Sequence, residues 1–166
     1  MKKKWLVLLI PVLALLFLGL GAVGQYNGLV DSYAEVENAQ ANVDTQLQRR
    51  YDLIPNVVAA VKGAMEHEEE IFTAIAEARA KIGSSQQGTG EYNQAQSQLD
   101  SAVSRLLVVA ENYPQLTANQ QVSDLITELE GTENRILVAR KDYNAVATSY
   151  NKKIKKSAQF VFSASY

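Results

Sequence analysis

The residues of this 166-residue chain that most suggest chemistry are His67 and the three glutamates that follow it. Imidazole and carboxylate groups are common metal ligands, so the spacing of the cluster decides what it could bind. Di-iron bundles place a glutamate three residues before each ligating histidine, whereas Ala64 stands at that position here. A zinc-protease helix needs a second histidine, and the chain has only one. We therefore expect a solvated acidic helix face and no metal site.

Other kinds of catalytic site are equally hard to assemble. The chain has no cysteine and one histidine, and its serines fall mainly in expected loops and tails, so no nucleophile, base and orienting group can be combined. It contains no glycine-rich phosphate-binding motif. With 16 basic and 18 acidic residues, the net charge of -2 gives no general attraction for nucleic acid. The sequence predicts a protein that is not an enzyme, has no cofactor and binds no nucleic acid.

A second distinctive feature is the pair Arg49 and Arg50, which precedes Pro55. Arg50 falls on an apolar helical stripe, where a charge needs an ionic partner or a route to water. Glu68 and Glu133 are the candidate partners, and a buried ion pair would fix helix register more than it would add stability. In the alternative, the aliphatic stem of Arg50 lies on the stripe and its guanidinium reaches solvent. The sequence leaves both alternatives open.

The amino-terminal segment precedes all of these residues and is strongly apolar. Residues 5–24 carry no charged side chain, follow three lysines and are long enough to cross a bilayer. The run is longer than the apolar region of a secretory signal peptide, and the small-residue site at 22–24 is imperfect, so we favour an uncleaved anchor over a cleaved signal. The lysines before the span predict a cytoplasmic amino terminus and an extracytoplasmic bundle. We therefore predict a single-pass protein of the cell membrane.

Beyond the anchor, apolar side chains recur at steps of three and four, as on one face of a helix. Four stripes follow one another, with residues 83–90 as the clearest loop. Because none of them can be buried alone, we predict an all-α, up-and-down antiparallel bundle with coiled-coil-like helices, the fourth packed along the first. The stripes are Tyr26, Leu29, Tyr33, Val36, Gln40, Val43, Leu47, Arg50 and Ile54; Val57, Val61, Ala64, Glu68, Ile71, Ile75, Ala78 and Ile82; Ala95, Leu99, Ala102, Leu106, Val109 and Tyr113; and Val122, Leu125, Leu129, Thr132, Ile136, Ala139, Tyr143, Val146 and Tyr150.

The predicted helix boundaries depend on Pro55, which removes a backbone donor and crowds the preceding turn. The first stripe should kink or restart just before it, where Asp52 is placed to cap a new helix. Because no glycine or polar cluster surrounds Pro55, we expect a kink with little loop and a chain reversal at residues 83–90, which leaves three extended arms. The fourth stripe should begin with a capping box formed by Thr117 and Gln120.

Two longer segments carry a family resemblance. Residues 43–72, VDTQLQRRYDLIPNVVAAVKGAMEHEEEIF, and residues 111–144, ENYPQLTANQQVSDLITELEGTENRILVARKDYN, resemble the two signatures of the LemA family of membrane-anchored bacterial proteins. With the amino-terminal span and YNGLV at residues 26–30, the likeness covers nearly the whole chain. It implies a helical bundle on one membrane anchor, related to a magnetosome-associated membrane protein type, and it implies no agreed activity.

The resemblance also marks domains and residues. We expect an anchor at residues 1–25, a LemA-like bundle at 26–156 and a carboxyl-terminal tail at 157–166. The motif residues expected to have a structural or interaction role are Arg49, Arg50, Tyr51, Asp52, Pro55, Asn56, Lys62, Gly63, His67, Glu68, Glu133, Asn134 and Arg135.

The end of the chain departs from the family pattern, in which an aromatic residue and a proline follow a Tyr-Asn-x-x-Ile step. Residues 151–166, NKKIKKSAQFVFSASY, lack that proline. Their four lysines, followed by Phe160, Val161 and Phe162, fit an amphipathic segment on a membrane surface. The same charges would also be favoured by the dipole at the end of a helix without any ligand.

These features lead to three hypotheses for function. In the first, the bundle is a membrane-anchored scaffold or protein-interaction module that self-associates, because long heptad stripes occur without a catalytic constellation. In the second, it is a sensor or adaptor that binds a protein or peptide on the surfaces of Arg49, Arg50 and residues 67–70. The third and weakest is a metal-dependent hydrolase. The expected partners are the lipid bilayer and either another copy of the chain or an unidentified protein.

Overall fold

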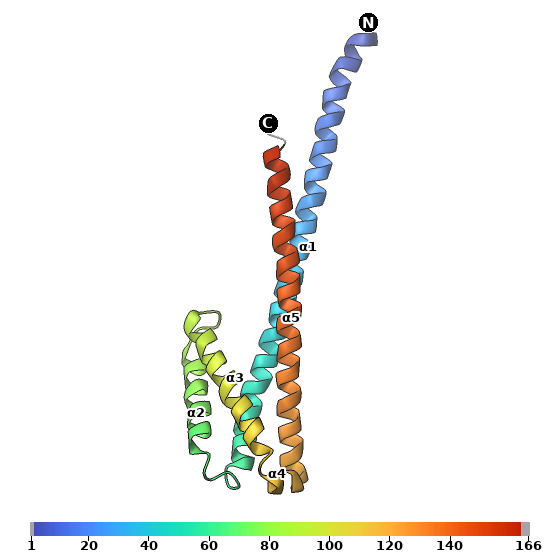
Figure 1. Cartoon of the computed structure of the whole chain (residues 1–166). Coiled ribbons are helices and arrows are strands. Elements are labelled where there is room, and N and C mark those ends of the chain that lie inside the picture. Colours follow the sequence, from blue (N-terminus) through green and yellow to red (C-terminus); the bar gives the residue numbers. More distant parts are fainter. Residues whose placement is uncertain (1, 164–166) are drawn as a thin grey trace. The chain divides into compact units, whose positions relative to one another are not determined.

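Helices account for nearly all of the chain in the computed structural model (Figure 1). They are α1 (Lys2–Val61), α2 (Glu69–Ser84), α3 (Gly90–Ala110), α4 (Pro114–Ala118) and α5 (Gln120–Ser163). The structure describes the backbone of residues 2–163 and the side chains of residues 13, 16, 19–116 and 118–159. No strand occurs within this described backbone, and the predicted all-α class is confirmed.

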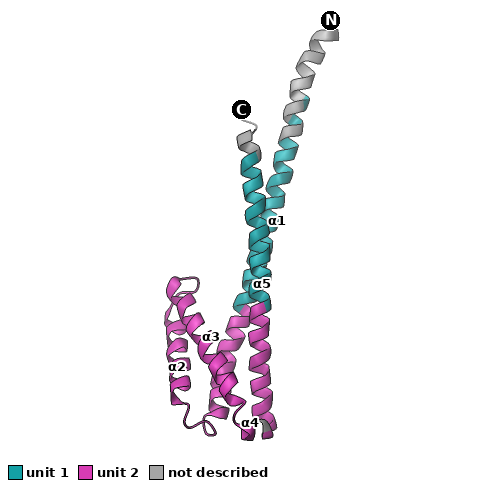
Figure 2. Cartoon of the chain, viewed as in Figure 1, with its two compact units in different colours: residues 1–44, 138–166 teal, residues 45–137 magenta. Residues whose placement is uncertain are grey.

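The helices form two compact units (Figure 2). Unit 1 consists of residues 1–44 and 138–166, and unit 2 of residues 45–137. Helices α1 and α5 contribute to both units, whereas α2, α3 and α4 belong to unit 2 alone. Unit 2 is therefore a small multi-helix bundle, and unit 1 is a pair of helices.

Unit 2 has one contiguous apolar core, built from the stripes at steps of three and four. Burying one Val, Leu or Ile side chain stabilises a fold by about 1.5–3 kcal/mol, so these positions dominate the stability of the unit. The fully or nearly fully buried members are Leu53, Ile54, Val57, Val61, Met65, Ile71, Phe72, Ile75, Ala78, Ile82, Ala95, Leu99, Ala102, Val103, Leu106, Ala110, Leu116, Val122 and Leu129.

Pro55 does not interrupt α1, so the restart of the helix that the sequence allowed there does not occur. The helix is continuous from Lys2 to Val61, and Pro55 is exposed within it. Its neighbours Ile54 and Val57 are each 1% exposed, and their packing in the core offsets the missing hydrogen bond of the proline. Asp52 therefore caps no helix; its carboxylate accepts a hydrogen bond from Gln48, one turn earlier, at 2.9 Å.

The chain instead reverses at residues 62–68, between α1 and α2, where the stripe pattern predicted a continuous helix (Figure 1). Backbone hydrogen bonds from Ala64 and Met65 to the carbonyl of Val61 form the turn, and the Met65 side chain is fully buried in the core. The sequence predicted one helix from Val57 to Ile82. In the structure this segment is divided between the end of α1 and α2, and the buried residues of the predicted stripe beyond the turn all lie on α2. The arrangement with three extended arms is wrong for this reason.

The predicted loop after the second stripe is confirmed, at residues 85–89. Gly88 has φ = 83°, a backbone conformation that residues with a Cβ rarely adopt. The Thr89 hydroxyl then caps α3 by accepting a hydrogen bond from the Tyr92 N–H at 3.2 Å.

The fourth stripe begins later than predicted. Thr117 lies within the short helix α4, and its side chain is outside the described residues. The side-chain oxygen of Asn119 instead accepts hydrogen bonds from the N–H groups of Gln121 and Val122, at 3.1 and 3.4 Å, and caps α5. The predicted start of this helix at a Thr117–Gln120 capping box is therefore wrong.

In unit 1, α1 and α5 lie side by side, as the fourth stripe predicted (Figure 2). The rings of Tyr33 and Tyr150 are 5.8 Å apart between centroids, and Lys153 hydrogen-bonds to Ser32. The first stripe is only partly correct, because Tyr26, Tyr33 and Gln40 remain exposed. Ser32, which the stripe omitted, is buried.

The predicted membrane span at residues 5–24 lies mostly outside the residues whose side chains are described. In the portion that the structure does describe, no helix combines the length and the apolar character needed to cross a membrane. At the carboxyl-terminal end, α5 extends to Ser163 and so includes residues 157–163 of the predicted tail. The side chains of Phe160, Val161 and Phe162 and all of residues 164–166 lie outside the described residues.

Candidate functional site

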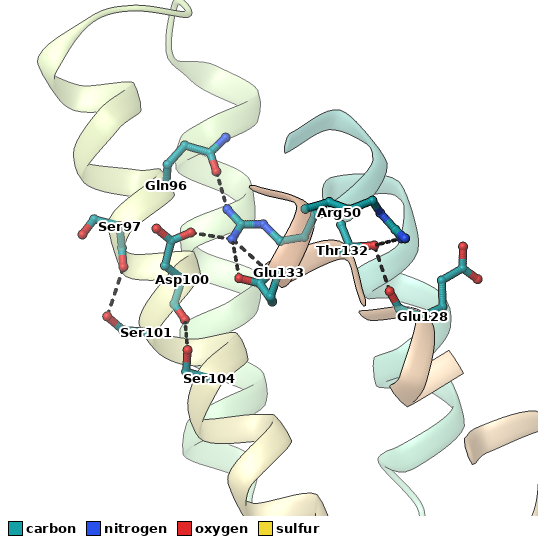
Figure 3. Close-up of polar contacts among 10 residues, drawn as sticks. Arg50, Gln96, Ser97, Asp100, Ser101, Ser104, Glu128, Thr132 and Glu133 are labelled. Carbon is teal, nitrogen blue, oxygen red and sulfur yellow. Dashed lines mark hydrogen bonds and ion pairs between the residues drawn. The ribbon is translucent and has the colours of Figure 1, made fainter. Parts of the chain in front are cut away.

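Arg50 of α1 is at the centre of a polar cluster inside unit 2, and none of its surface is exposed (Figure 3). Its Nη1 forms ion pairs with Asp100 of α3 and with Glu133 of α5, the latter at 3.2 Å. Its Nη2 donates to the side-chain oxygen of Gln96, also on α3, at 2.7 Å. One guanidinium therefore joins three helices, because its planar fork presents several donors in fixed directions.

This geometry decides between the two interpretations of Arg50. Glu133 is a partner, as predicted, and the alternative in which the guanidinium reaches solvent is wrong. Glu68 is not a partner; its carboxylate accepts a hydrogen bond from Tyr113. Asp100 was not predicted as a partner; it is adjacent to Leu99 and therefore just beside the apolar stripe of α3. A polar residue at the edge of a stripe, one turn after Gln96, is the signal that could have identified it.

The electrostatics of the cluster favour a fixed arrangement of the helices. One positive charge lies between two carboxylates whose side chains keep 29% and 24% exposure, so water solvates their outer edges. The Nε of Arg50 is buried without a hydrogen-bond partner. Gln96 extends the network, because its amide nitrogen donates to the Tyr92 hydroxyl at 2.9 Å. Removing one member would leave buried polar groups unpaired, which is strongly unfavourable.

Arg50 belongs to three consecutive residues that together contact every other long helix in unit 2. Arg49 pairs with Glu128 of α5 at 2.8 Å on the exposed side. The guanidinium of Arg79, on α2, lies over the ring of Tyr51, with its central carbon 4.4 Å from the ring centroid. Successive residues on a helix point about 100° apart, so the segment Arg49–Tyr51 reaches α5, α3 and α2 from one turn of α1.

The remaining motif residues are not gathered into this cluster. Pro55 and Asn56 are exposed on α1, and Lys62, Gly63 and His67 are exposed in the turn at residues 62–68. On α5, next to Glu133, Asn134 and Arg135 are exposed, and Arg135 donates to the buried Thr132 hydroxyl at 3.2 Å.

The acidic cluster at residues 67–70 lies where the turn after α1 ends and α2 begins. Glu69 and Glu70 are exposed in the first turn of α2, where the helix dipole favours negative charge. Glu70 forms an ion pair with Arg105 of α3 at 3.1 Å. Among the residues that the structure describes, no group of three or more histidine, aspartate or glutamate side chains is arranged to hold a metal ion.

Glu68 and Tyr113 form a second polar contact, between the turn that precedes α2 and the residue that precedes α4. The Tyr113 hydroxyl donates to the Glu68 carboxylate at 3.2 Å. Partial burial, the hydrogen bond to Glu68 and the negative charge of Glu68 together raise the pKa of Tyr113 above its usual value of 10.0. All three effects favour the neutral phenol, so Tyr113 keeps the proton that it donates to Glu68 at neutral pH.

Known proteins resemble the chain over most of its length. The model of the LemA family matches residues 39–165. The chain is 28% identical over 132 residues to protein LemA of Metamycoplasma hominis, which covers 80% of this chain and 60% of that protein. It is 27% identical over 176 residues to magnetosome protein MamQ of Magnetospirillum gryphiswaldense, with coverage of 91% and 65%. It is also 27% identical over 157 residues to magnetosome protein MamQ 2 of Paramagnetospirillum magneticum, with coverage of 80% and 58%. The chain thus spans less than two thirds of the length of these relatives.

Proposed function

This chain belongs to the LemA family, and from that membership we propose that it is a membrane-anchored helical scaffold that associates with further copies of itself. The proposal assigns residues 1–25 to the membrane anchor, with the amino terminus in the cytoplasm and the helical units outside. It requires no cofactor and no catalytic group. The function of such a scaffold is to hold copies, or proteins bound to them, at a fixed place on the membrane.

The observation that carries the proposal is an exposed apolar stripe on α1 in unit 1. Tyr26, Val30 and Tyr33 follow one another at steps of four and three, the spacing of a coiled-coil seam. They are 68%, 48% and 49% exposed. Contiguous exposed apolar side chains on a protein are characteristic of interaction surfaces.

A second copy of the chain is the partner that suits this stripe. Residues 5–30 contain no charged side chain, so two such segments can meet without burying a charge or opposing like charges. Copies anchored by the same end also present the same segment at the same height above the bilayer, which favours parallel pairing. The stripe ends at Glu37, one step of four beyond Tyr33, so the pairing would be confined to the membrane-proximal part of α1.

The sensor or adaptor hypothesis receives less support. It placed a ligand on the surfaces of Arg49, Arg50 and residues 67–70. Arg50 is inside the bundle and engaged with three side chains, and Arg49 is ion-paired with Glu128. The exposed acidic residues remain, but Glu70 is itself paired with Arg105.

Cysteine crosslinking tests the self-association directly, because the chain has no cysteine of its own. Val30→Cys places a thiol on the exposed stripe. Glu35→Cys is the matched control, since residue 35 is also exposed on α1 but lies about 140° around the helix from residue 30. Each variant is expressed as the full chain, oxidised in its native membranes and separated by non-reducing electrophoresis.

We expect the Val30→Cys variant to form a disulfide-linked dimer and the Glu35→Cys variant to remain largely monomeric. Equal crosslinking of both variants would indicate random collisions in the membrane. No crosslinking at position 30, with the protein present in the membrane, would refute pairing through this stripe.

A further inference from the structure

Unit 1 has an open groove with a volume of about 400 Å³ between α1 and α5, lined by Gln25, Gly28, Leu29, Lys153, Lys156 and Ser157. We propose that this groove binds the phosphate of an anionic phospholipid headgroup at the membrane surface. The proposal rests on the membrane anchor of the proposed function and adds to it a specific lipid site. The named lining residues are called the headgroup groove below.

The charge of the headgroup groove favours an anion. Lys153 and Lys156 are three residues apart and therefore share a face of α5. The facing helix has no aspartate or glutamate in residues 19–30. Asp31 is the first acidic residue after this stretch, and no described carboxylate forms an ion pair with either lysine. An anionic ligand would therefore gain charge-assisted hydrogen bonds from both.

Ser32 holds one of these lysines at the groove. Its side chain is 3% exposed, and its hydroxyl donates to the Gly28 carbonyl at 2.7 Å and accepts a hydrogen bond from Lys153. A hydroxyl is a neutral acceptor, so it orients the ammonium group without cancelling its charge. A lysine ammonium has three donors, which leaves two of them for a ligand.

Gly28 provides the room for the ligand. A Cβ placed on this residue would meet no atom within 4 Å, so the space beside the backbone is open. The amide of Gln25 and the hydroxyl of Ser157 add uncharged donors, and Leu29 adds an apolar wall. A phosphodiester with a glycerol backbone needs this combination, because its phosphate oxygens accept hydrogen bonds and its acyl roots are apolar.

The position of the groove along α1 favours a lipid over a soluble phosphate. Gly28 is four residues beyond the end of the predicted membrane span at residues 5–24, a distance on the order of 6 Å along a helix. Tyr26, between the two, is exposed, and tyrosine is enriched where membrane helices meet the headgroup layer. With residues 5–24 in the bilayer, as the proposed function has them, the groove falls at the level of the headgroup layer.

The test uses the full chain in phosphatidylcholine nanodiscs that contain a minor fraction of phosphatidylglycerol. Native mass spectrometry counts the phosphatidylglycerol molecules that stay bound when the chain is released. Lys153→Gln with Lys156→Gln removes the two groove charges. Lys152→Gln with Lys155→Gln is the matched control, because it removes the same charge from the same two turns outside the groove. Gly28→Leu fills the groove without changing any charge and raises helix propensity at that position.

We expect the wild-type chain to retain phosphatidylglycerol in preference to phosphatidylcholine. In both the Lys153/Lys156 variant and Gly28→Leu, the ratio of bound phosphatidylglycerol to bound phosphatidylcholine should fall at least about tenfold. In the Lys152/Lys155 variant this ratio should stay within about twofold of the wild type. An equal loss in the two lysine variants, or no loss in Gly28→Leu, would overturn the groove as the site. Displacement of the lipid by an equal concentration of glycerol phosphate would overturn a lipid as its ligand.

A different result is expected if residues 1–25 do not anchor the chain in a bilayer. In that case the wild-type chain would not float with vesicles of phosphatidylcholine alone, and both the proposed function and the groove's place at a membrane would be refuted. A chain that floats with these vesicles but shows no preference for phosphatidylglycerol would refute only the headgroup groove.

Discussion

At the scale of single residues, Arg50 determines how the helices of unit 2 fit together. It contacts Asp100, Glu133 and Gln96, which come from two helices other than its own. The sequence predicted the partner on α5 but not the one on α3, because a carboxylate beside an apolar stripe normally faces solvent. Whether Arg50 would be buried was also undecidable from the sequence, since a long side chain can reach water from the edge of a core.

Replacing Arg50 with alanine should destabilise the fold far more than the same change at Arg49. Without the guanidinium, Asp100 and Glu133 repel each other and Gln96 loses its partner. We expect a loss of about 3 kcal/mol in the free energy of unfolding, at the lower end for buried pairs because both carboxylates are partly exposed. Arg49→Ala breaks an exposed pair and should cost at most about 1 kcal/mol.

Denaturant unfolding of the full chain in detergent, followed by circular dichroism, measures both values. Similar small losses for the two variants would mean that the buried cluster does not hold the bundle together.

Tyr113 makes the fold sensitive to alkaline pH. Its folded-state pKa is raised above 10.0, so the contribution of its contact with Glu68 is fully present below about pH 10 and is lost as the pH rises through the raised value. The difference in tyrosinate absorbance between the wild type and Tyr113→Phe isolates this residue among the eight tyrosines. We expect its midpoint to lie above pH 10 and to fall in Glu68→Gln; a midpoint at or below 10 in the wild type would contradict the contact.

At the scale of elements, periodicity predicted the buried faces of α3 and α5 and failed at the junction of α1 and α2. It also placed the end of α3 at Tyr113, whereas the helix ends at Ala110, and it placed the start of α5 too early. The buried positions Val57, Val61, Ile71 and Ile75 keep steps of three and four when Ala64 and Glu68 are counted between them. The stripe therefore shows no break, although the chain turns at residues 62–68. At Pro55 the helix does not restart, because core packing around a helix can outweigh the local cost of a proline.

Pro55→Ala tests this explanation of α1. Alanine restores the backbone donor toward the Tyr51 carbonyl and removes the clash of the ring, while the exposed position demands no particular side chain. We expect the free energy of unfolding to rise by about 1–3 kcal/mol, measured by denaturant unfolding of the full chain. A decrease would show that α1 requires the local geometry that proline imposes.

At the scale of the whole molecule, the two units have different compositions of surface and core. Unit 2 has an extensive apolar core and an internal ionic cluster, as expected for a rigid bundle. In unit 1, the described buried residues are Ser32 and Ala139, and several apolar side chains of α1 are exposed. An apolar helix face that is not covered within the chain is buried by the bilayer or by another molecule, and the scaffold proposal assigns the part beyond residue 25 to a second copy. Sequence alone predicted the stripes but not which of their residues would remain exposed, since that depends on the register between α1 and α5.

The most direct test of the scaffold proposal is the mass of the assembly that the full chain forms when it is extracted gently from its native membranes. Native mass spectrometry of the extracted material gives both the number of copies and the identity of any other protein. The proposed function predicts a homo-oligomer that disappears when Tyr26 and Val30, both exposed on the stripe, are replaced together by glutamate. A monomer, or a single defined complex with a different protein, would contradict self-association and favour an adaptor.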